Sequence, residues 1–131
     1  MNAWNIPDSL EKEVRDRDKK CVYCGVEMLQ KVTRGSERGT VATWEHIIND
    51  ARIITRENIA LCCCACNASK GQKRLVDWLR SSYCAKHGIR EDTVAQIVKK
   101  ALALAPKPPN QSMQWERVHR TRRTISAVYA E

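Results

Sequence analysis

Four cysteines lie in two Cys-x-x-Cys pairs, Cys21/Cys24 and Cys63/Cys66. Two pairs separated by about forty residues are typical of one tetrahedral zinc site. Four sulfur ligands complete the coordination shell, so we expect this zinc to hold the fold together and to leave no open position for chemistry. Structural zinc supplies roughly 10–16 kcal/mol of apparent binding energy in small domains, so we expect the metal to be part of the fold.

The other three of the seven cysteines do not share this spacing. We therefore expect Cys62 and Cys64 to be bystanders and Cys84 to be a buried thiol on a helix. The first residues lead directly into a charged stretch rather than into the apolar core of a signal peptide, and no apolar run approaches the roughly 18 residues of a membrane span. A reducing cytoplasmic compartment without membrane contact, in which cysteines bind metal or stay free, is the expectation.

Between the two pairs the chain contains Glu45 and His46 in direct succession. Imidazole is an effective general base near neutral pH, and a carboxylate beside it is a ligand for a hard divalent ion. A metal-dependent phosphodiesterase needs both groups. Neighbours on a regular strand point to opposite faces, so the two side chains can share a site only if the strand ends or bulges there.

Several elements must position these residues. We predict a helix over residues 9–19, opened by a capping box at 8–11, a strand over 41–48 and a short strand over 58–61. A helix should begin near Cys66, pass through Lys70 and weaken or end at Gly71. Gly25 should allow the tight turn that directs the first cysteine pair toward one point.

The second half of the chain is predicted to be helical. The apolar pattern from Leu75 to Tyr83 indicates one amphipathic helix closing near residues 87–88, and a clearer 3.6-residue pattern indicates another over 91–105. The predicted organisation is an N-terminal helix (1–20), a core (21–71), a helical extension packed on the core (72–105), and a proline-containing linker with a basic tail (106–131). Monomer and homodimer remain equally open.

The chain is basic, with a formal net charge of +8, and most of the excess follows residue 71. A basic surface could bind phosphates, but lysine and arginine on a solvated surface serve solubility equally well. Charge alone therefore does not identify a partner.

The combined pattern resembles the HNH endonuclease family over roughly residues 17–71. The matching elements are the first Cys-x-x-Cys pair, then Glu45-His46-Ile47-Ile48, then Glu57-Asn58-Ile59-Ala60-Leu61, then Cys63-x-x-Cys66-Asn67-x-x-Lys70-Gly71. Relatives more often have aspartate in place of Glu45, and the stretch after Ile48 lacks their usual proline and glycines.

This resemblance implies an α+β fold with a small ββα-metal, treble-clef-like core beside a structural zinc. It implies His46 as the general base that activates water, and Glu45 and Asn67 as ligands of a catalytic divalent ion such as Mg²⁺ or Mn²⁺. Asn58 would brace the loop next to the histidine. Lys70, and Arg74 beyond it, would bind phosphates of a DNA substrate, which a single site would nick. Such cores occur in bacterial and phage proteins.

Each of these residues also has a simpler interpretation. His46 could be a zinc ligand or a buried polar residue, and Glu45 a surface residue of the strand. Asn58 fits a turn, Asn67 a helix cap and Lys70 a solvated surface. The rival hypothesis for the whole chain is a zinc-stabilised nucleic-acid-binding module without hydrolytic activity. A thiol redox protein explains neither the second cysteine pair nor the Glu-His-Asn set.

Overall fold

The computed structural model describes residues 2–31, 34–35 and 38–104 of the protein. Its elements, in chain order, are α1 (Asp8–Arg17), the 3-10 turn η1 (Arg38–Thr40), β1 (Ala42–His46), β2 (Ile59–Cys63), α2 (Cys64–Lys70), α3 (Leu75–Leu79), α4 (Ser82–Lys86) and α5 (Gln96–Leu104). The described part is thus a small α+β fold, as predicted. The expected proline-containing linker and basic tail lie outside it.

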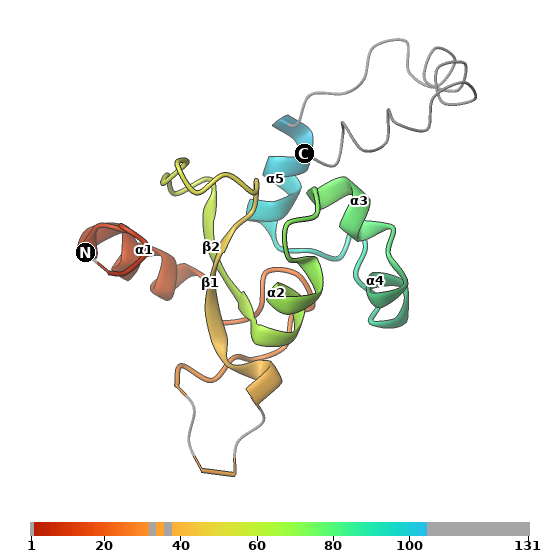
Figure 1. The fold of residues 1–131 in the computed structure, drawn as a ribbon, viewed down its shortest axis with the longest axis horizontal. Coiled ribbons are helices and arrows are strands. Elements are labelled where there is room, and N and C mark those ends of the chain that lie inside the picture. The colour runs from red at the N-terminus through yellow and green to blue at the C-terminus, as the bar shows by residue number, and fades with distance from the viewer. Residues whose placement is uncertain (1, 32–33, 36–37, 105–131) are drawn as a thin grey trace.

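The two strands form an antiparallel hairpin with regular register, from Ala42 opposite Cys63 to His46 opposite Ile59. Figure 1 shows α1 on one side of this hairpin and α2 on the other. Every residue of β2 is buried. The hairpin therefore presents one face to the N-terminal helix and the opposite face to α2.

Helix α1 does not begin with the expected capping box. Its N-cap is Pro7, which has no side-chain acceptor, and Asp8 is already the first helical residue. Asp8 and Glu11 both lie in the first turn. Acidic side chains there interact favourably with the positive end of the helix dipole, so Asp8 and Glu11 favour this helix start without forming a capping box.

The single helix predicted from Leu75 onward is two short helices. α3 ends before Arg80, and Ser81 is the N-cap of α4, with its hydroxyl accepting a hydrogen bond from the Cys84 N–H at 3.3 Å. A serine that caps a new helix favours a break in the preceding one. Its side-chain oxygen accepts a hydrogen bond from a backbone N–H in the first turn of the new helix, which a continuous helix would satisfy with a backbone carbonyl. The predicted end of the helix, near His87 and Gly88, agrees with the structure.

The last helix also begins later than predicted, at Gln96 instead of near residue 91. The Ala95 N–H donates to the Val22 carbonyl at 2.9 Å, and this bond ties the start of α5 to the cysteine-containing turn. Val94, Val98 and Ala101 from the predicted apolar stripe are buried. Within the described residues, no helix is long and apolar enough to cross a membrane.

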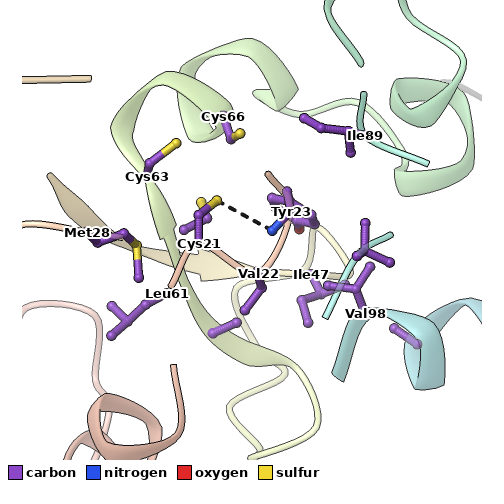
Figure 2. Packing of buried hydrophobic residues seen from close by; sticks show 14 of the residues in the cluster. Cys21, Val22, Tyr23, Met28, Ile47, Leu61, Cys63, Cys66, Ile89 and Val98 are labelled. Atoms are coloured by element: carbon purple, nitrogen blue, oxygen red, sulfur yellow. Dashed lines mark hydrogen bonds between the residues drawn. The ribbon is translucent and has the colours of Figure 1, made fainter. Parts of the chain in front are cut away.

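The buried side chains form one cluster that joins the hairpin and the five α-helices. Figure 2 shows Val22, Tyr23 and Leu61 together with Ile47, Ile89 and Val98, which come from widely separated parts of the chain. Trp78 of α3 is fully buried, and its ring packs edge-on against Tyr23 with centroids 4.8 Å apart. The helices after residue 71 therefore share a core with the hairpin.

Candidate metal centre and the residues around it

The four predicted zinc ligands come together. The sulfur atoms of Cys21, Cys24, Cys63 and Cys66 all lie within 4.8 Å of one another, and those of Cys24 and Cys63 are 3.7 Å apart. Zn–S bonds of about 2.3 Å in a tetrahedron place sulfurs about 3.8 Å apart. The cluster has the composition and the size to hold one structural zinc ion.

The first pair is shaped by a tight turn. Gly25 follows Cys24 with φ +79°, and its N–H donates to the Cys21 carbonyl at 3.0 Å. This is the left-handed region that glycine enters without strain, so the turn that we expected from Gly25 is present. The N–H groups of Tyr23 and Cys24 point at the Cys21 sulfur, at 3.4 and 3.5 Å, and Figure 2 shows the first of these bonds.

The second pair lies at the junction of strand and helix. Cys63 ends β2 and is the N-cap of α2, and Cys66 lies in the first turn of that helix. The hydroxyl of Tyr83, in α4, donates to the Cys66 sulfur at 3.4 Å. Tyr83 is a contact that the sequence did not suggest, because it lies outside both cysteine motifs.

Hydrogen bonds between the thiols shift their proton affinities. The Cys21 sulfur accepts from Cys63 and Cys66, and this lowers the pKa of Cys21 well below its ordinary value. The same sharing raises the pKa of the two donors. The cluster therefore favours a thiolate at Cys21, which is the form that binds a metal.

The remaining cysteines are separate from the cluster. Among the described residues, the group that could hold a metal ion contains neither Cys62, Cys64 nor Cys84. Cys62 and Cys84 are buried, and burial raises the pKa of each. Both therefore remain thiols in the core, as expected for Cys62 as a bystander and for Cys84 as a buried thiol on a helix.

The carboxylate of Glu45 is held by two donors in the interior. The Lys70 ammonium lies 2.9 Å from Glu45 Oε2, and the Tyr23 hydroxyl donates to the same oxygen at 2.5 Å. The Lys70 side chain is 1% exposed and the Glu45 side chain 6%. Burial, followed by the Glu45 charge, raises the pKa of Tyr23, which therefore stays a neutral donor. Lys70 thus does not lie where a phosphate in solvent could reach it, in contrast to its expected role.

Asn67 lies in α2, and Arg74 is the N-cap of α3. Asn67 is half-buried, and its Nδ2 donates to Thr43 Oγ1 at 2.9 Å and to the Trp44 carbonyl at 3.0 Å. These bonds fix α2 against β1, since they join the helix to two consecutive strand residues. Arg74 is exposed just before α3 and pairs with Asp77 at 2.9 Å.

His46 lies on the other face of the hairpin. Its ring meets the edge of the Trp4 ring with centroids 6.5 Å apart. His46 Nε2 is buried and has no hydrogen-bond partner among the described residues. Since His46 is not part of the metal-binding group, its interpretation as a zinc ligand does not apply.

Asn58 fastens the loop that follows His46. Its Oδ1 accepts from the Ile48 N–H at 2.7 Å, and its Nδ2 donates to the carbonyls of Ile48 at 3.2 Å and Ile53 at 3.1 Å. The side chain is 3% exposed. The amide therefore joins the two ends of the loop between β1 and β2.

The implied catalytic divalent ion does not fit this arrangement. The strand stays regular through His46, without a bulge, so Glu45 and His46 point to opposite faces. The Glu45 carboxylate is already paired with Lys70. We therefore derive no chemical step through such an ion.

Comparisons with known proteins give no further identification. No protein-family model, no curated protein and no solved structure matches this chain.

Proposed function

We propose that the chain is an HNH-type endonuclease that hydrolyses phosphodiester bonds in DNA and is stabilised by a structural zinc ion. The observation that carries this proposal is the arrangement of the elements. His46 ends β1 of an antiparallel hairpin that runs directly into α2, and the four-cysteine cluster closes the unit. These parts follow one another in the order of the residue pattern that resembles the family.

His46 is the proposed general base. Its Nε2 has no protein partner within the described residues, so this nitrogen can accept a proton from an attacking water once the water reaches it. The water would then attack phosphorus, and the bond to the leaving oxygen would break. Asn58 is a positioning residue in this proposal, because it fixes the loop that starts two residues after His46.

The proposed substrate is DNA, as the resemblance implies, and the net charge of +8 is compatible with a polyanionic partner. One active site cuts one strand, so we expect nicking by the monomer. Whether cleavage requires Mg²⁺ or Mn²⁺ is left to the experiment below. The proposed location of the protein is the cytoplasm of a bacterial or phage-infected cell.

A second candidate function is a zinc-stabilised nucleic-acid-binding module without hydrolytic activity. The pairing of Glu45 with Lys70 favours it, because this carboxylate is not presented to a catalytic ion. Both functions predict zinc binding and DNA binding that weakens with salt. They differ in whether any phosphodiester bond is cut.

Incubation of zinc-loaded protein with supercoiled plasmid separates the two functions. Reactions contain Mg²⁺, Mn²⁺ or EDTA, and compare the wild type with His46→Ala. The matched control is His87→Ala, which removes an exposed histidine that stacks on Tyr83 and lies outside the proposed site. We expect nicked circles from the wild type, with the three conditions showing whether an ion is needed, and His46→Ala to lower the rate by at least about 100-fold.

The other outcomes are informative. Equal cutting by a folded His46→Ala variant would keep the class of enzyme and reject the histidine as the base. Binding of plasmid without cutting, for all variants and ions and on a library of target sequences, would favour the binding module.

A further inference from the structure

Trp4 is the most exposed tryptophan among the described residues. It is 55% exposed, whereas Trp44 is half-buried and Trp78 is fully buried. Indole rings are mostly buried in folded proteins, and they are enriched where a protein binds a partner. The exposed ring of Trp4 is therefore a candidate binding surface.

A hydrogen-bonded turn holds Trp4 in place. Asn2 Oδ1 accepts from the N–H of Trp4 at 2.8 Å and from the N–H of Ile6 at 3.2 Å. The Ile6 side chain is fully buried and anchors the turn in the core. Asn5 has φ +61°, a left-handed conformation that asparagine adopts more readily than most residues. Because the backbone on both sides of the indole is fixed, a ligand that contacts the ring orders little of the chain.

The ring of Trp4 lies beside His46. The two centroids are 6.5 Å apart, and the ring planes are inclined at 64°. An inclined pair of this kind meets edge to face, so the imidazole does not lie flat over the indole. A second planar ring can therefore stack on Trp4 and remain next to the proposed general base.

The other aromatic ring on this face is already covered. Trp44 lies two residues before His46 on β1, so the two side chains share a face of the hairpin. The Arg15 guanidinium lies over the Trp44 ring, 4.9 Å from its centroid, and Glu11 balances its charge at 3.2 Å. This face therefore offers a nucleic acid the open ring of Trp4, which suits the flat face of a base better than a phosphate.

We propose that Trp4 stacks on an unpaired base of the DNA strand, next to the phosphodiester bond that His46 would help to cut. This role deepens the proposed function, on which it rests for the identity of the partner. A base inside a duplex is stacked between its neighbours, so its face is free only where the strand is single or locally open. The substrate class is therefore single-stranded or locally unpaired DNA. Negative supercoiling favours such openings, so plasmid nicking is consistent with this class.

The test is fluorescence anisotropy of a labelled single-stranded DNA oligonucleotide, titrated with zinc-loaded, full-length protein without added Mg²⁺ or Mn²⁺. Trp4→Ala and Trp4→Leu remove the aromatic ring, and Trp4→Phe keeps one. Stacking of one base on an aromatic side chain is worth about 5- to 150-fold in affinity, so we expect both ring-free variants to bind that much more weakly. Trp4→Phe should retain most of the affinity. A duplex of the same sequence should bind equally to the wild type and to Trp4→Leu.

Two controls separate stacking from a general loss of binding. Val76→Ala removes part of an exposed apolar side chain in α3, and it should leave the affinity for the oligonucleotide unchanged. The salt dependence of binding should be the same for the wild type and Trp4→Leu, because a stacked base releases no counterions. Circular dichroism checks that each variant is folded, and if Trp4→Ala is not, Trp4→Leu against Trp4→Phe still isolates the ring.

Equal affinity of the wild type and Trp4→Leu for the single strand would overturn the role of Trp4, whether or not the wild type nicks plasmid. An equal loss of affinity for the duplex would overturn it as well, because Trp4 would then serve a contact common to both forms. Absence of binding to any DNA by the wild type would overturn it together with the DNA substrate. Binding to the single strand that depends on the ring, without any cleavage, would support stacking and reject only hydrolysis.

Discussion

At the scale of single residues, Asn58 shows how one buried amide can define a loop. It makes three hydrogen bonds to Ile48 and Ile53, and it uses both its oxygen and its nitrogen to do so. No carboxylate can copy this pattern, because a carboxylate cannot donate. The loop after His46 therefore depends on this particular side chain.

Replacing Asn58 with alanine should destabilise the protein. The change removes three hydrogen bonds and leaves part-buried backbone groups without these partners, so we expect the free energy of unfolding to fall by about 2–4 kcal/mol. Urea denaturation of the zinc-loaded variant measures this. The control is Asn49→Ala, an exposed residue with one long bond to Gln72, which should change the free energy by less than about 0.5 kcal/mol. Equal effects of the two substitutions would contradict the bracing role.

The sequence predicts the positions of some residues of the candidate site better than those of others. The spacing of the cysteines was sufficient to select the four that converge, because Cys-x-x-Cys geometry is local to each pair. The pairing of Lys70 with Glu45 was not predictable, since it depends on how α2 packs on β1, and nothing local distinguishes this lysine from a solvated one. From the alternation of side chains along a strand, the sequence did indicate that Glu45 and His46 could share a site only if the strand ended or bulged there. The hairpin is regular up to His46, so the two side chains point to opposite faces.

At the scale of elements, the short helix α4 has a role that its length does not suggest. It carries Tyr83, whose ring stacks between those of Trp78 and His87 at centroid distances of 6.0 and 4.2 Å. The stack holds the hydroxyl against the Cys66 sulfur. The sequence predicted helical residues here, but it missed the break at Ser81, because apolar periodicity continues across a capping residue.

The variant Tyr83→Phe should lower the affinity of the cysteine cluster for zinc without disturbing the stacking of the ring on Trp78 and His87. It removes the hydrogen bond to Cys66 and keeps the ring, and hydrogen bonds to a metal-binding side chain contribute about tenfold or more to metal affinity. We expect a chelator to extract zinc from the variant about ten times faster. Ser82→Ala, on the exposed side of the same helix, is the control. An unchanged extraction rate would mean that the hydroxyl does not act on the metal centre.

At the scale of the whole molecule, the cysteine cluster joins the parts that carry the candidate site. It connects the turn at residues 21–25, the end of β2 and the start of α2. The turn is also bonded to α5 through Val22 and to β2 through Leu61. Few large aromatic side chains are available to a chain without phenylalanine, so a metal ion bound by the cluster would compensate for a small core.

Removal of zinc should therefore unfold the described domain as one unit. Zinc binds thiolates, so protons compete with it, and acidification should release the ion and the fold together.

Circular dichroism and a zinc indicator, followed together during a titration from pH 8 to about pH 4, measure the coupling. We expect the two signals to change at the same pH, and addition of EDTA at pH 7 to give the same unfolded spectrum. Excess zinc should move the midpoint to lower pH, since mass action opposes the protons. Retention of the folded spectrum after complete loss of zinc would show that the core is self-sufficient, and would leave the cluster without its structural role.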